Sequence, residues 1–384
     1  MQKLSLHSFF TKYFFIILWT LQVLQQTSLP INFKPLLYLL MGISFVYIAI
    51  KNRFLFNKVF LVVHIIMIIY ILYWLLFDHS LFGLQYIVLK ISIFGMIAAS
   101  LYYNFDYVEK KYPYYMLIVS GVVLIVGLLL NHDFGNRYSG PFDNSNSLGF
   151  LSALAFTVTL FYLRNGLKKN LLLLFFISLA FMSGSRAAVG GILLGYLLKG
   201  GVSLRKILTI LAATVLLIGV NQVATSYGFT TGIDRLISSS ERHDLLAGRD
   251  MEFTLGIKSI EESPVEGHGL DHYAHLSDRI VMLSGVLRRD ANFAVNPHNS
   301  FIGLFIQLGI PFGLALLFAL IYYVSKSVLF KPRNKLFLVM ILYPFLSGFF
   351  ESFLFGVNGF EGTTFWFALL YYQVYMHIKR EEGR

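Results

Sequence analysis

Apolar runs of membrane-spanning length recur along the whole 384-residue chain, with short polar connections between them. A helix needs about 20 mostly apolar residues to cross the hydrocarbon core of a bilayer. Hydrophobic residues make up 57% of the chain and charged residues only 13%, which departs strongly from the composition of a soluble domain. The sequence therefore predicts an all-α polytopic membrane protein of about 12 transmembrane helices. We place these spans at 13–28, 35–50, 59–77, 82–103, 114–130, 147–163, 170–183, 186–198, 206–222, 299–323, 336–355 and 361–378.

The net charge of +11 is distributed unevenly among the connections. Lysine and arginine concentrate in the connections 51–58, 104–113, 164–169, 199–206 and 324–335. The alternate connections hold only Arg137 and Arg186; they are 78–81, 131–146, 183–186 and 356–362. Basic loops remain on the cytoplasmic side of a membrane. We therefore expect both termini in the cytoplasm, and the basic balance needs no nucleic acid to explain it.

One connection, residues 223–298, is far longer than the others, and the same alternation places it outside the cytoplasm. Apolar residues at helical spacing predict a helix over 249–262, and Pro264 and Gly267 end it. The loop is therefore expected to be partly helical. Three parts result: an N-terminal transmembrane bundle at 1–222 with about 9 spans, the extracytoplasmic loop domain at 223–298, and C-terminal transmembrane helices at 299–384 with about 3 spans.

Polar residues suited to an anionic ligand gather at the predicted outer face. The planar fork of arginine binds phosphate oxygens through two hydrogen bonds and keeps its charge. We take as candidate catalytic residues His298, Arg249 and Arg186, and as candidate substrate-binding residues Arg137, Asn146 and Asn299. Two alternatives stay open: an arginine at a membrane interface often only anchors to lipid headgroups, and a histidine before a helix often only caps or packs.

The chain has no cysteine and no glycine-rich loop of the kinds that bind nucleotides, so we expect no cofactor. A metal site is the alternative for the histidines at 268, 272 and 275, whose spacing allows ligands on one helical face. Gly267 and Gly269 flank the first of them and favour a turn there, so we predict no metal. Inside the predicted spans, His64, Lys90 and Glu351 are costly enough to require partners or a cavity, unless they lie near helix ends, where that cost falls.

Four motifs, taken in order, resemble the O-antigen ligase and polymerase superfamily. Residues 296–301 (Asn-Pro-His-Asn-Ser-Phe) with 307–313 resemble the end of the family's conserved region, and Gly248-Arg249 with 263–269 resembles its loop signature. Residues 183–186 and 140–146 resemble two further landmarks. The chain departs from the pattern where His268 stands between the glycines of the loop turn. Two residues, Glu351 and Glu361, compete as the acidic residue that some members carry.

The resemblance implies glycosyl transfer at the outer face of the bacterial cytoplasmic (inner) membrane, from an undecaprenyl-pyrophosphate-linked glycan donor to a glycan acceptor, without metal or nucleotide. We favour a polymerase of repeat units, since no separate acceptor domain is evident. One alternative is a ligase that moves finished glycan to lipid A-core or another acceptor. Another, from a different class, is a transporter or flippase of lipid-linked oligosaccharide. The sugar, its linkage and the oligomeric state stay open.

Overall fold

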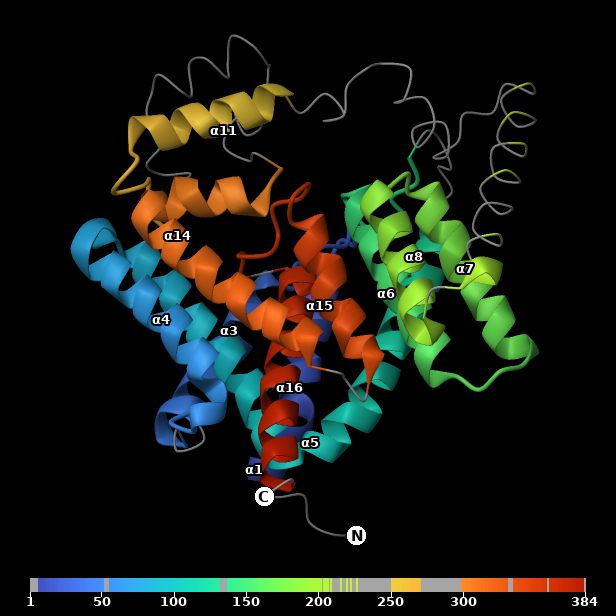
Figure 1. Cartoon of the computed structure of the whole chain (residues 1–384), viewed down its shortest axis with the longest axis horizontal. Helices are drawn as coiled ribbons and strands as arrows, with labels where there is room; N and C mark the ends of the chain where they lie inside the picture. Colours follow the sequence, from blue (N-terminus) through green and yellow to red (C-terminus); the bar gives the residue numbers. More distant parts are fainter. Residues whose placement is uncertain are drawn as a thin grey trace.

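The computed structural model describes residues 6–51, 55–131, 137–201, 203–206, 250–270, 298–330, 334–357 and 359–382, with single residues at 208, 215, 219, 222 and 226. Within these residues the chain is helical between its connections, and no β-strand occurs (Figure 1). The elements are α1 (Leu6–Phe9), the π-helix η1 (Phe10–Phe14), α2 (Phe15–Gln25), α3 (Lys34–Ile50), the 3₁₀-helix η3 (Lys58–Phe60), α4 (Leu61–Tyr73), the π-helix η4 (Trp74–Asp78), α5 (Leu81–Leu130), α6 (Ser145–Tyr162), α7 (Leu167–Met182), α8 (Arg186–Gly200), α11 (Asp250–Glu262), α14 (Ser300–Leu329), α15 (Lys335–Ser347) and α16 (Phe360–Glu382).

Four helical stretches of the described part are long and apolar enough to cross a membrane: 58–78, α5, α6 and α14. Two shorter apolar helices, α3 and α15, accompany them. The all-helical membrane class is therefore supported, whereas the number of 12 spans and the three-part division stay predictions.

Helix α5 unites two spans that the sequence analysis separated. It runs from Leu81 to Leu130 and is interrupted by non-helical dihedrals at Asn104 (φ −141°, ψ 41°). The basic connection predicted at 104–113 is thus helical, and Figure 1 shows the chain changing direction there. The basic residues of this connection and the lengths of the apolar runs beside it predicted such a change of direction. Residues 105–113 are nevertheless helical, so their backbone groups stay paired within the chain.

Helices α6, α7 and α8 pack as one group through small residues. A tight turn joins α7 to α8, and Gly184 takes a left-handed conformation in it (φ 61°). A Cβ atom at Gly149 of α6 would lie only 2.8 Å from the Ser183 hydroxyl, and one at Gly195 of α8 only 3.0 Å from the Thr157 hydroxyl of α6. Such small residues let membrane helices approach closely.

The loop helix predicted at 249–262 is confirmed as α11 (Asp250–Glu262), which lies across the end of the molecule over the first part of α14 (Figure 1). Helix α14 breaks at Gly309, where φ is 66°. The turn after α11 occupies this break. The backbone N–H of His268 donates to the Ile306 carbonyl (2.7 Å), and that of Ile310 donates to the Pro264 carbonyl (2.7 Å).

Glycines make this joint possible, because the two backbones touch. A Cβ atom at Gly267 would lie 2.4 Å from the Gly309 nitrogen, and one at Gly309 would lie 2.2 Å from the Val265 carbonyl oxygen. The Tyr73 hydroxyl lies 2.6 Å from the Gln307 carbonyl oxygen and accepts the N–H of Gly269 at 3.0 Å. The loop turn and the broken helix therefore form one unit.

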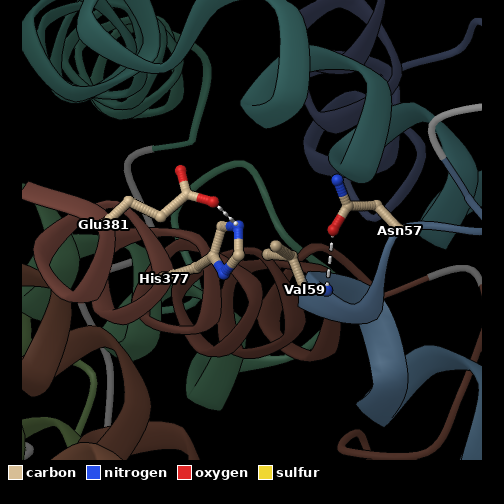
Figure 2. Close-up of polar contacts among 4 residues, drawn as sticks. All are labelled: Asn57, Val59, His377 and Glu381. Atoms are coloured by element: carbon tan, nitrogen blue, oxygen red, sulfur yellow. Dashed lines mark hydrogen bonds and ion pairs between the residues drawn. The ribbon is translucent and has the colours of Figure 1, made fainter. Parts of the chain in front are cut away.

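At the end of the molecule opposite α11, polar side chains bind backbone groups at the helix termini. Lys169 donates to the Leu160 carbonyl at the end of α6 (2.8 Å), where a cation suits the partial negative charge of the helix. Figure 2 shows two further local contacts, the side chain of Asn57 capping η3 through the Val59 N–H (3.0 Å) and His377 beside Glu381 (3.0 Å), one helical turn apart in α16. The end of α16 lies on this side (Figure 1).

A cysteine introduced at Val265 should react with an impermeant thiol reagent in intact cells, because the loop is predicted outside. Val265 is 54% exposed, and the matched control Leu204, 72% exposed, lies in the basic connection 199–206 predicted inside. We expect Leu204→Cys to react only after the inner membrane is broken. The reverse pattern would invert the topology and move the candidate site to the cytoplasm.

Gly309→Ala should lower the free energy of unfolding by about 1–3 kcal/mol, since alanine is strained at this dihedral and its Cβ would meet the Val265 carbonyl. Gly303 provides the control in the same helix, because a Cβ there meets no atom within 4 Å. Thermal unfolding in detergent measures both variants. Equal melting temperatures for the two would contradict the role given to the break.

Candidate functional site

A cavity of about 570 Å³ lies where six helices begin or end. It is bounded by the end of α2, the starts of α6, α8, α14 and α16, and the end of α15. Its lining residues are Gln25, Gln26, Asp143, Asn144, Asn146, Ser147, Phe150, Ser185, Ala187, His298, Tyr343, Ser347, Glu351, Ser352, Phe353, Gly356, Val357, Gly359 and Glu361. Helix ends carry polar groups and loops, so the cavity is polar although the surrounding bundle is apolar.

The entry to α6 supplies one polar wall. Asn144 caps the helix by accepting the Asn146 N–H, which holds the Asn146 side chain at the cavity. The Asn146 amide then donates to a Glu351 carboxylate oxygen (2.6 Å) and accepts from the Arg137 guanidinium (2.6 Å). Arg137 also donates to the Ser183 carbonyl in the turn before α8 (3.4 Å). Asn146 thus bridges Arg137, which is not a lining residue, and the carboxylate of the lining residue Glu351.

A second hydrogen-bonded group lies at the start of α16. The Glu361 side chain is only 4% exposed, and its Oε2 accepts from the Gln26 amide (2.9 Å). The Ser147 hydroxyl lies 2.9 Å from Glu361 Oε1 and 2.8 Å from Gln26 Oε1. This glutamate needs such partners because a buried carboxylate is costly when it is unpaired.

His298 faces the same cavity from the start of α14. Its backbone is left-handed, with φ 46°, a conformation that non-glycine residues adopt only where the surrounding structure enforces it. The enforcing contacts belong to the next residue. Asn299 caps α14 by accepting the N–H groups of Phe301 (2.9 Å) and Ile302 (3.0 Å), and its amide donates to the Phe349 carbonyl (2.9 Å). The cap therefore fixes the direction in which His298 leaves the helix.

The connection 348–359, here termed the strap, closes the cavity between α15 and α16. Its carbonyl groups accept hydrogen bonds from side chains of four helices. The contacts are Gln22 to Val357 (3.2 Å), Tyr86 to Phe355 (2.5 Å), Lys90 to Gly356 (3.1 Å), Ser300 to Glu351 (2.5 Å) and Trp366 to Leu354 (3.0 Å). The strap is therefore held by donors that project from otherwise apolar helices.

The six predicted site residues differ in their positions relative to the cavity. His298 and Asn146 line the cavity, and Arg137 binds Asn146 without being a lining residue itself. Arg186 is exposed at the first position of α8, beside the lining residue Ser185 but outside the lining itself. Asn299 is a helix cap in its described contacts, so a substrate-binding role stays a prediction. Arg249 lies outside the described residues.

Several lining residues were missed by the sequence analysis, among them Gln25, Gln26, Ser147 and Tyr343. Adjacent glutamines at the end of an apolar span were the available signal, because an amide there requires a partner or water. The expectation that Lys90 and Glu351 need partners is confirmed by their contacts.

The histidine cluster proposed as the alternative metal site is only partly described. His268 is buried, and its Nε2 lies 2.8 Å from the Ser259 carbonyl oxygen, a structural contact that holds the loop turn to α11. His272 and His275 lie outside the described residues. Within the part of the chain that the structure describes, no group of three potential ligands could hold a metal ion. Metal independence stays a prediction.

Residues 171–318 match the family model described as O-antigen ligase. The matched segment begins in α7 and ends in α14, and it contains Arg186, Arg249, His298 and Asn299. This match confirms the resemblance to the O-antigen ligase and polymerase superfamily and supports a membrane protein of polysaccharide biosynthesis. No curated protein matches the sequence.

Ser300→Ala should lower the free energy of unfolding by about 1–3 kcal/mol, because it deprives the Glu351 carbonyl and the Leu354 N–H of a buried partner. Ser327→Ala is the control: it is buried in the same helix but bonds only its own helix, at the Tyr323 carbonyl. Equal effects of the two substitutions on melting temperature would show that the strap contact adds nothing.

Proposed function

We propose that this protein polymerises undecaprenyl-pyrophosphate-linked oligosaccharide repeat units into surface polysaccharide at the outer face of the bacterial inner membrane. The observation that carries the proposal is the cavity in which His298, inside the matched segment, meets a set of amide, hydroxyl and carboxylate groups. A histidine that can reach a hydroxyl in a partly enclosed polar site suits general-base catalysis.

The reaction joins an acceptor hydroxyl to the anomeric carbon of the donor glycan. His298 takes the hydroxyl proton, the oxygen bonds to the anomeric carbon, and the bond from that carbon to the pyrophosphate oxygen breaks. The pyrophosphate leaves on its polyprenyl carrier, and attack from the opposite side inverts the anomeric centre. Pyrophosphate is already a good leaving group, so the scheme requires no cofactor.

Arg186 and Arg249 are the proposed ligands of the pyrophosphate. Charge develops on its bridging oxygen as the bond breaks, and positioned donors stabilise that charge; removal of one such donor typically costs on the order of 10²–10³ in rate. Arg186 is suited by its exposed place beside the cavity rim, at the N-terminus of α8, where helix N–H groups favour an anion.

A ligase that transfers finished glycan to a terminal acceptor is the second candidate, favoured by the description of the matching family. It shares the same chemistry and differs only in the acceptor. A transporter would be expected to expose a broken helix at an ion or substrate site. The break of α14 is instead filled by backbone groups of the loop turn, which disfavours that alternative.

The glycan profile of a deletion strain distinguishes these functions. Loss of a polymerase should leave single repeat units on the terminal acceptor, and loss of a ligase should leave long polymer on the lipid carrier. Accumulation of unpolymerised lipid-linked units on the cytoplasmic side would indicate the transporter. An unchanged profile would refute the proposed function altogether.

His298→Ala should reduce glycan transfer by about 10²–10⁴-fold, because the general base is lost while the cap at Asn299 is kept. Reconstituted protein with lipid-linked repeat units measures the rate. His377→Ala is the control, since His377 lies in α16 near its C-terminal end and outside the cavity lining. Near-normal polymer from the His298 variant would end its catalytic assignment.

A further inference from the structure

We propose that the cavity is the acceptor-sugar subsite and that it selects a neutral or amino sugar over an acidic one. This inference rests on the proposed glycosyl transfer and names its acceptor class. Every charged side chain of the described lining, apart from His298, is a carboxylate, from Asp143, Glu351 or Glu361.

The described cations near the cavity are not among its lining residues. Arg137 binds the lining residue Asn146, and Lys90, which is only 2% exposed, binds the carbonyl of the lining residue Gly356. Besides His298, the charged groups that the described lining presents to a ligand are therefore carboxylates.

The carboxylates of the described lining disfavour the pyrophosphate deep in the cavity. A doubly charged group there would have to leave water and approach like charges in a partly enclosed site. Among the described residues, Arg186, exposed beside the cavity rim, is better placed for the donor pyrophosphate. The molecule that shares the cavity with His298 is the one that brings the hydroxyl.

The rest of the lining has the chemistry of a sugar site. The Gln26, Ser147 and Glu361 group offers donors and acceptors within one hydrogen-bonded set, which suits neighbouring hydroxyl groups.

Aromatic rings complete the subsite. Phe150 and Tyr343 stack with their ring centroids 4.8 Å apart, and Phe353 packs edge-on to Phe150 at 5.6 Å. All three rings line the cavity; Phe150 and Tyr343 are largely buried, and Phe353, the least buried of them, offers apolar surface to the carbon–hydrogen face of a pyranose. A carboxylate on that sugar would meet the three acidic side chains, whereas an amino group would be attracted by them.

Saturation-transfer NMR on the purified protein in nanodiscs tests the selectivity with three probes: methyl glucoside, methyl glucosaminide and methyl glucuronide. We expect the first two to bind and the glucuronide to bind at least about tenfold more weakly, a factor that corresponds to about 1.4 kcal/mol. Asp143→Asn, at an exposed lining position, and Glu361→Gln, which keeps acceptor and donor atoms, should each narrow this difference. Glu381→Gln, exposed near the end of α16, is the charge-matched control and should leave the difference unchanged.

Binding of the glucuronide as tight as that of the glucoside would overturn the inference, and so would the absence of binding by all three probes. Melting temperatures show whether the Asp143→Asn and Glu361→Gln variants are folded. If both are folded and neither changes the preference for the neutral sugar, the sugar binds outside this cavity. These results are independent of the glycan profile of the deletion strain. The selectivity can therefore fail while the polymerase assignment stands, or stand while the assignment fails.

Discussion

The rest of the structure depends on one constraint: a backbone that leaves helical geometry inside an apolar bundle must find hydrogen-bond partners within the protein, because the surroundings offer none. The strap meets this constraint with side chains from α2, α5, α14 and α16, which donate to its carbonyl groups. The break in α14 meets it with backbone groups of the loop turn. Both solutions bring segments that are distant in the sequence into fixed contact.

The cavity is a consequence of these solutions. Polar side chains are tolerated where helices end, and the cavity lies where six helix termini meet. The donors that hold the strap also fix the backbone that carries Glu351 and Ser352 along one wall. His298 is fixed in the same manner, because the cap at Asn299 ties the start of α14 to the strap through Phe349. The geometry of the site is thus set by helix ends rather than by a separate catalytic domain.

Hydropathy and motif spacing predicted the helical class, the helix α11, and the presence of His298 and Asn146 at one site. They could not predict that Gln25 and Gln26 of the first span reach the same cavity, because that contact depends on how α2 packs against α16. They also could not predict that residues 105–113 of the basic connection are helical, since such a connection has the same composition whether it is a loop or a helix. Arg137 and Arg186 each lie in a connection with no other lysine or arginine, yet Arg137 binds the lining residue Asn146 and Arg186 is exposed. That difference follows from the turn before α8, which accepts a hydrogen bond from Arg137 through Ser183.

The joint between the loop turn and α14 is made largely of main-chain atoms: carbonyl and N–H groups of 264–269 meet those of 306–310. Its specificity therefore resides in the absence of side chains at Gly267 and Gly309 rather than in any particular pair of side chains. Exposed neighbours such as Val265 and Glu266 are consequently free to vary in chemistry without altering the fit. The loop turn can in this way change the surface that it exposes while its attachment to the helical bundle keeps one geometry.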